Sequence, residues 1–276
     1  MANIDTYLRN IQNATYGEEV RGSIHDALKA INDDEEALVG TVSPQTHSRI
    51  FRGKNLGSVV TDEQKAAIRD GTFKDIFLGD YWSVANNFWR IVDVDYWYNT
   101  GPYNHIVTTH HLVIIPDKLL YYHVMNDSGT TTGGYVGSKM YADGLTEAKT
   151  IINNIFGDAV LEHREYLSNA ATDGIITGMI SMRSTVEIPS EIMIYGTNIF
   201  SPINDGTYMF RGQTYCRTQL ALFNIAPRFI NIERDTFWLR DVVSSDRFAA
   251  LAESGLAYSY PANQRFIGVR PYFCIG

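Results

Sequence analysis

Cysteine is scarce in this chain of 276 residues, which contains Cys216 and Cys274 and no others. Two cysteines exclude a scaffold held together by several disulfides, and no CxxC pair offers the spacing of a zinc site. A single bridge and two free thiols are both compatible with the sequence. We expect the second alternative, with Cys274 packed as a small apolar side chain in a strand.

Long apolar runs are also missing. No segment approaches the roughly 18 residues that a membrane-spanning helix needs. The opening "MANIDTYLRN" lacks the apolar core of a signal peptide. We therefore expect no membrane insertion. We expect the protein to be made in a cytosol and to leave it by another route, such as host lysis.

Positive charge is the minority charge and is not gathered into runs. The chain has 23 Lys and Arg against 31 Asp and Glu, which gives a net charge of −8 and a pI of about 5.3. Proteins that bind nucleic acid or anionic membranes through phosphates need clustered Lys and Arg. The composition therefore disfavours both classes of partner.

The usual catalytic motifs are absent: there is no GxGxxG, GxxxxGK[ST], HExxH or GxSxG. His110 and His111 are adjacent at the start of a predicted strand, so they face opposite ways and do not share a metal ion. Asp93 and Asp95 are predicted to lie on one face of a strand, where they form either an ordinary solvent-exposed pair or a cation or acid/base site. We expect no enzyme activity, no cofactor and no metal site.

Residues 1–40 carry two narrow apolar stripes, which predict two helices with a break at Gly17. The stripes consist of Ile4, Leu8 and Ile11, followed by Val20, Ile24, Leu28 and Ile31. Neither helix can bury itself alone, so we expect packing on copies of the chain or on a partner. The predicted assembly is a homo-oligomer, specifically a trimer. A helical hairpin lying on its own domain is the alternative.

Residues 41–70 are predicted to be a connector with a short helix, since Thr61 and Gln64 form a capping box and Gly71 offers a stop. Residues 71–276 are predicted to be an α+β domain. Its expected elements are a hairpin with the turn "ANN" in "GDYWSVANNFWRIVDVDYW", a buried strand in "HHLVIIPD", helices in "TEAKTIINNIFG" and "LEHREYLSNA", a loop-rich stretch over 172–236, and strands at the end. His163, Arg164 and Glu165 are expected to make structural polar contacts on the second helix.

The C-terminal segment places varied chemistry between two apolar, strand-like runs, "TFWLRDVV" and "GVRPYFCI". Framework positions predicted to be buried are Trp238, Leu239, Val242, Val269 and Phe273. Aromatic, charged and amide side chains between the runs are predicted to lie together on one exposed face and to form a recognition surface. These residues are Asp246, Arg247, Glu253, Tyr258, Tyr260, Asn263, Gln264, Arg265 and Phe266.

The same segment resembles the end of C-type-lectin-like domains in bacteriophage and bacterial surface proteins. The shared frame is WLRDVVS at 238–244, FA at 248–249, GxA at 255–257 and GVRPxFCIG at 268–276. The resemblance implies a C-type-lectin-like fold, similar to formylglycine-generating enzymes, over residues 71–276. Some members of this family are the variable proteins of diversity-generating retroelements. The first residues, "IDTYLRNIQNATYGEEVRGSIHDAL", resemble the opening helices of phage tail, baseplate and fibre proteins.

These resemblances imply a phage virion protein, in a tail, fibre, baseplate or head fibre, that binds a host-surface receptor of glycan or protein. Residues 1–40 are then expected to attach to other virion proteins. The alternative is a structural capsid-decoration or tail-adaptor protein, and a third hypothesis is a formylglycine-generating-like enzyme. The Glu-Pro-Asn pattern of calcium-dependent lectins is absent, so we do not expect calcium-dependent sugar binding.

Overall fold

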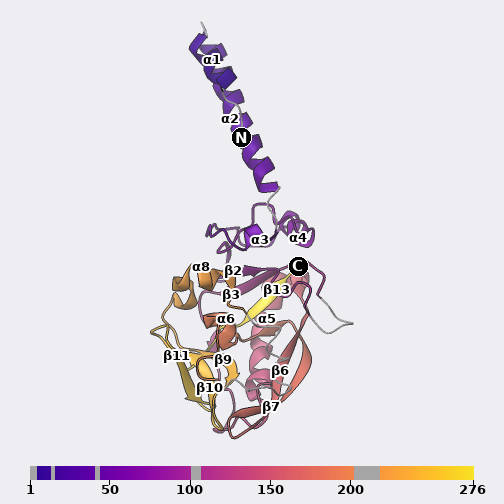
Figure 1. Ribbon diagram of the computed structural model, residues 1–276, viewed down its shortest axis with the longest axis vertical. Helices are drawn as coiled ribbons and strands as arrows, with labels where there is room; N and C mark the ends of the chain where they lie inside the picture. Colours follow the sequence, from indigo (N-terminus) through magenta and orange to yellow (C-terminus); the bar gives the residue numbers. More distant parts are fainter. Residues whose placement is uncertain (1–4, 14–15, 41–43, 101–106, 202–217) are drawn as a thin grey trace. The chain divides into compact units, whose positions relative to one another are not determined.

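The computed structural model describes residues 5–13, 16–40, 44–100, 107–201 and 218–276. The chain divides into two compact units, Met1–Ser43 and Pro44–Gly276, both drawn in Figure 1. The first unit contains α1 (Asp5–Asn13) and α2 (Gly17–Gly40), which contact each other. Both helices lie where the apolar stripes predict them, and α2 begins at Gly17. The apolar side chains of Leu8, Ile24, Leu28 and Ile31 are exposed on this unit.

The second unit begins at Pro44, so from that residue on the stretch predicted to be a connector, 41–70, belongs to the same compact unit as residues 71–276. It includes α3 (Pro44–His47) and the predicted short helix α4 (Asp62–Arg69), whose capping box is confirmed. The chain between them forms two parallel bridges, Phe51 to Leu78 and Asn55 to Tyr81. Backbone pairing with the domain explains why this stretch is not a free connector.

The first sheet joins the two ends of the domain. Its order is β1 (Tyr81–Val84), β2 (Asn87–Val94), β3 (Leu112–Pro116), β13 (Tyr272–Ile275) and β5 (Val160–Leu161), and β8 (Val186–Glu187) also pairs with β13. The predicted hairpin and its turn are confirmed, with Ala85 and Asn86 both at positive φ. The predicted buried strand is β3. The last strand, β13, pairs with β3, next to the first hairpin.

The second sheet carries the C-terminal segment. Its order is β11 (Ala257–Pro261), β10 (Arg247–Leu251), β9 (Phe237–Val242), β12 (Gly268–Val269) and β4 (Tyr121–Tyr122). The strands β9, β10 and β11 are drawn in gold in Figure 1. A separate hairpin consists of β6 (His163–Thr172) and β7 (Ile175–Ser184). The predicted α+β class is confirmed.

One long helix packs against the first sheet. α5 (Leu145–Phe156) follows the π-helical turn η1 (Met140–Gly144), and it ends at Gly157, whose φ is 53°. Phe156 packs on Trp89 and Phe273 at ring-centroid distances of 5.5 and 4.8 Å. The shorter helical elements are η2 (Gly157–Ala159), α6 (Glu191–Tyr195), α8 (Ala221–Ile225) and η3 (Pro227–Asn231).

The predicted helix in "LEHREYLSNA" is wrong, because this stretch forms strand β6. His163, Glu165 and Leu167 alternate inward and are buried, and β6 pairs with β7 along its length. The buried polar side chains hid the period of two that marks a strand. The stretch 172–236, predicted to be loop-rich, contains the strands β7 and β8 in its first part.

The predicted framework is confirmed. Trp238, Leu239, Val242, Val269 and Phe273 are each fully buried. Cys274 is a buried free cysteine in β13, as expected, whereas Cys216 lies outside the described residues.

Candidate functional site

The predicted recognition residues lie on β10, on β11, in the turn before β10 and in the turns that flank β11. None of the nine is buried: five are exposed and four are half-buried. The exposed ones are Glu253, Tyr258, Asn263, Arg265 and Phe266, and the half-buried ones are Asp246, Arg247, Tyr260 and Gln264. β11 is an edge strand among the described strands, so one side of its backbone pairs with no further strand of this sheet.

Three aromatic side chains form a continuous row, which we call the aromatic row: Tyr258, Tyr260 and Phe266. Ring centroids are 4.8 Å apart between Tyr258 and Tyr260 and 5.6 Å apart between Tyr260 and Phe266. The two ends of the row remain open to solvent, with Tyr258 49% and Phe266 57% exposed. Burial raises the pKa of Tyr260, with smaller contributions from Tyr258 and Glu253. The hydroxyl therefore stays protonated at neutral pH and can donate a hydrogen bond.

The row stands on the buried framework. Tyr260 pairs with Phe248 in the β10–β11 register, and its ring lies edge-on to Trp238 at 6.5 Å. The Trp238 indole donates to the carbonyl of His123 at 2.7 Å. The aromatic row thus packs on the buried side chains of Trp238 and Phe248 through Tyr260, while its outer surface is exposed to solvent.

The remaining predicted residues are only partly brought together. The turn holding Asn263, Gln264 and Arg265 follows β11, and the Ala262 amide donates to the Asp246 carbonyl at 2.8 Å, which places Asp246 beside this turn. Arg247 precedes Phe248 in β10, so its side chain lies on the opposite face of the sheet from Tyr260. The prediction that all nine residues lie on one face is therefore wrong for Arg247.

The other titratable residues singled out in the sequence, Asp93, Asp95, His110 and His111, form hydrogen bonds within the domain. Asp93 is buried and accepts from the amides of Val94 and Ala221, and burial raises its pKa to about 7. Asp95 leaves the strand with a φ of 58°, so the two carboxylates do not share a strand face as predicted. Its carboxylate binds the His110 ring at 2.7 Å and the His111 amide at 2.9 Å.

The inward side chains of β6 form a buried ionic network with β9 and β13. His163 contacts the Glu165 carboxylate at 2.7 Å, and Arg240 and Tyr272 donate to the same carboxylate. Burial opposes the charged forms, yet Cys274 and Glu165 raise the pKa of His163 to about 10. Arg240 and His163 lower the pKa of Glu165 to about 2. The predicted structural role of His163 and Glu165 fits these contacts, although on a strand.

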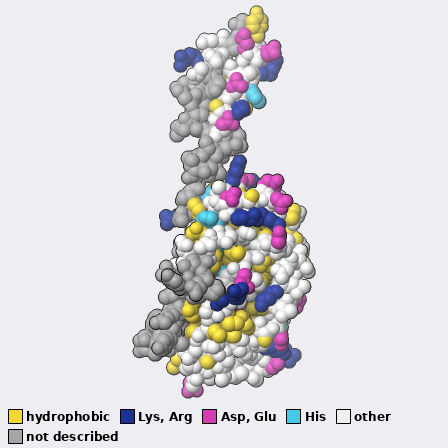
Figure 2. All heavy atoms as spheres, turned by 90° about the vertical axis from the view of Figure 1, so that its right-hand side faces the viewer, with side chains coloured by type: hydrophobic (Ala, Val, Ile, Leu, Met, Phe, Trp, Pro, Cys, Tyr) yellow, Lys and Arg dark blue, Asp and Glu magenta, His cyan; other side chains and the backbone are white. Residues whose placement is uncertain are grey.

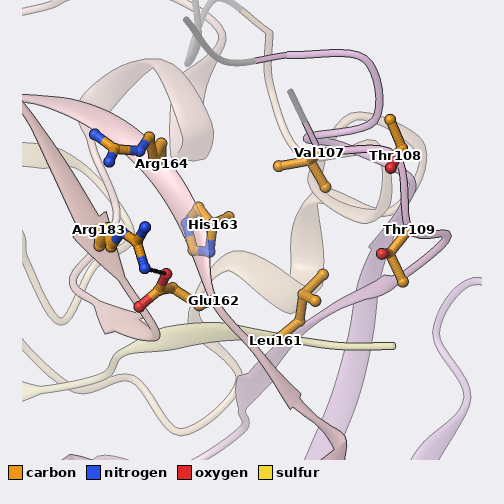
Figure 3. A pocket seen from close by; sticks show the side chains of 8 residues that line it. All are labelled: Val107, Thr108, Thr109, Leu161, Glu162, His163, Arg164 and Arg183. Carbon is orange, nitrogen blue, oxygen red and sulfur yellow. Dashed lines mark hydrogen bonds and ion pairs between the residues drawn. The ribbon is translucent and has the colours of Figure 1, made fainter. Parts of the chain in front are cut away.

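Two cavities were not anticipated from the sequence. One, of about 210 Å³, opens beside β5 and β6. Figure 3 shows Glu162, His163 and Arg183 on one side of it and Val107 and Thr109 on the other, and Glu162 pairs with Arg183 at 3.0 Å. The second, of about 320 Å³, adjoins the turn between β10 and β11. Both are lined by segments that are distant in the sequence, so no local sequence pattern predicts them.

Charges of both signs share the surface. Figure 2 shows Lys and Arg interspersed with Asp and Glu on the face in view, with hydrophobic patches between them. Within the described ranges, no three His, Cys, Asp or Glu side chains converge as metal ligands would. Among the helices of the described residues, none combines the length and apolar character needed to cross a membrane.

Comparison with known proteins gave no relative. No protein-family model, no curated protein and no solved structure matches this chain.

Proposed function

We propose that this chain is a bacteriophage virion protein that binds a host-surface receptor through the aromatic row and the turn at residues 263–265. The proposal includes a C-type-lectin-like fold for the domain, on the strength of the resemblance in residues 238–276. It also assigns the chain a binding rather than a catalytic role.

The observation that carries the proposal is the aromatic row itself. Tyr and Trp rings supply large contact areas at low entropic cost, and they dominate the centres of binding interfaces. An exposed aromatic group on an edge strand is also a liability for aggregation, which a protein without a partner for it would avoid. A virion carries many copies, so even weak single contacts would give strong attachment.

We predict that replacing the row with Tyr258→Ala, Tyr260→Ala and Phe266→Ala abolishes most adsorption to the host. Loss of central anchors costs on the order of 2 kcal/mol or more in binding, about a 30-fold change. Adsorption of the purified chain to host cells or envelopes measures it, with the thermal melt of each variant alongside.

The matched control is Tyr122→Ala, because Tyr122 is 60% exposed on β4 at the opposite edge of the same sheet. It should adsorb like the parent. A triple variant that melts near the parent and still adsorbs fully would place the receptor site elsewhere.

Residues 1–40 would form the virion-attachment and oligomerisation module. The exposed side chains of Ile24 and Leu28 on α2 are the contacts we assign to a homotrimer. Light scattering of the full chain should give the trimer mass, and Ile24→Lys with Leu28→Lys should give a monomer. A parent chain that stays monomeric at micromolar concentration, or a trimer that survives both substitutions, would rule out this assembly.

One observation favours the structural alternative, a capsid-decoration or tail-adaptor protein. β7 pairs only with β6 among the described strands, and its Ile175 and Ile180 are exposed. An open apolar strand edge suits pairing with a neighbouring subunit. Normal adsorption of the triple variant of the aromatic row would favour this structural alternative over receptor binding.

A further inference from the structure

The cavity of about 320 Å³ lies between η3 and the turn 253–255 that leads into β11. Its polar lining includes Arg228, Asn231, Arg234 and Glu253. It therefore adjoins the strand that carries the aromatic row, and one of the predicted recognition residues, Glu253, stands on its wall.

Arg228 is held in place without an anionic partner. Its guanidinium lies over the rings of Phe229 and Phe51, at 4.8 and 5.2 Å from their centroids. Stacking uses the faces of the guanidinium plane and leaves the N–H donors at its rim available. Among the described residues, no carboxylate pairs with this side chain.

Arg234 is the second cation of the cavity. Its φ of 58° lies in the left-handed region, which is unusual for a long side chain and marks a constrained position. Glu233 and Asp235 flank it in the sequence, but neither lines the cavity. Arg234, too, has no ion pair with any residue that the structure describes.

The walls are fixed by one amide. The Asn231 side chain donates to the carbonyls of Ala252 and Glu253 at 3.0 and 3.1 Å, and it accepts from the Asp235 amide at 3.0 Å. These bonds tie η3 to the β10–β11 turn and hold both sides of the cavity together. A site held before its ligand arrives loses less entropy on binding.

We propose that this cavity binds the carboxylate or phosphate group of an acidic sugar on the host surface. Each of the two guanidinium groups presents paired N–H donors that can bind two oxygens of a carboxylate or of a phosphate, and the two cations outnumber the single carboxylate of Glu253. That carboxylate accepts hydrogen bonds from sugar hydroxyls. In a chain of net charge −8, two unpaired cations at one cavity call for an anionic ligand. The inference rests on the proposed receptor-binding function.

The test titrates the full chain with glucuronate, glucose 6-phosphate and neutral glucose, followed by saturation-transfer NMR or calorimetry. At least one charged sugar should bind about tenfold or more tightly than glucose, and the preferred one identifies the anionic group. Arg234→Asn and Arg228→Gln should each weaken that binding by about tenfold. Asn tolerates the left-handed backbone, so Arg234→Asn should melt like the parent.

The matched control is Arg69→Gln, an exposed arginine of α4 outside the cavity, which should bind like the parent. The proposal would be overturned if neither charged sugar binds, if glucose binds as tightly as the charged sugars, or if both cavity variants keep the affinity of the parent. Host adsorption separates the two hypotheses. If the chain binds the charged sugar but does not adsorb to the host, the anion-binding cavity is supported and the proposed receptor-binding function is refuted. If it adsorbs without binding either charged sugar, the proposed function is supported and the anion-binding cavity is refuted.

Discussion

Trp238→Ala is expected to lower the free energy of unfolding by about 3–5 kcal/mol, as truncation of large buried aromatics does. Trp238 is fully buried in a cluster with Phe248, Ile267 and Val269. The substitution leaves a cavity there and removes the indole donor to the His123 carbonyl. Chemical denaturation of the two chains measures the difference.

The control for this substitution comes from the same segment. Phe266→Ala removes a ring that is 57% exposed and should change stability by no more than about 0.5 kcal/mol. The contrast tests the division between buried framework and displayed surface on which the proposed function depends. Equal costs for the two substitutions, or a melt unchanged by Trp238→Ala, would refute that division.

Local signals in the sequence predicted the elements whose structure depends on near neighbours. The capping box at Thr61 and Gln64 and the "ANN" turn each act within a few residues, and each lies where it was predicted. The helix predicted in "TEAKTIINNIFG" is also present, and it ends at Gly157. The two framework runs were predictable for a related reason, because their apolar residues point to burial whatever they pack against.

Strand β6 was not predictable in this way. Its inward side chains His163 and Glu165 read as polar surface of a helix, and their burial is stabilised by Arg240, which lies 75 residues further along the chain from Glu165. The Arg228–Arg234 cavity escaped for the same reason, because η3 and the turn 253–255 meet only in the folded domain. In both cases the chemistry depends on tertiary contacts that no spacing encodes.

The second large effect is expected at this buried network. Arg240→Met should cost about 3–5 kcal/mol, because it removes a partner of the Glu165 carboxylate while that charge stays buried. Arg69→Met, at an exposed site, should cost no more than about 0.5 kcal/mol. Adding Glu165→Gln to Arg240→Met should recover part of the loss, since it removes a buried carboxylate that retains only His163 as a cationic partner.

The cost of Arg240→Met should also depend on pH with a defined sign. Glu165 has a pKa of about 2 in the folded chain against 4.5 ordinarily, so its pairing stabilises the fold fully above pH 4.5. This contribution is lost as the pH falls from 4.5 toward 2. The difference in stability between the parent and Arg240→Met should therefore be largest at neutral pH and shrink over that interval. A difference that stays constant from pH 7 to pH 3 would show that Arg240 acts through packing alone, and that its charge does not hold the Glu165 carboxylate ionised.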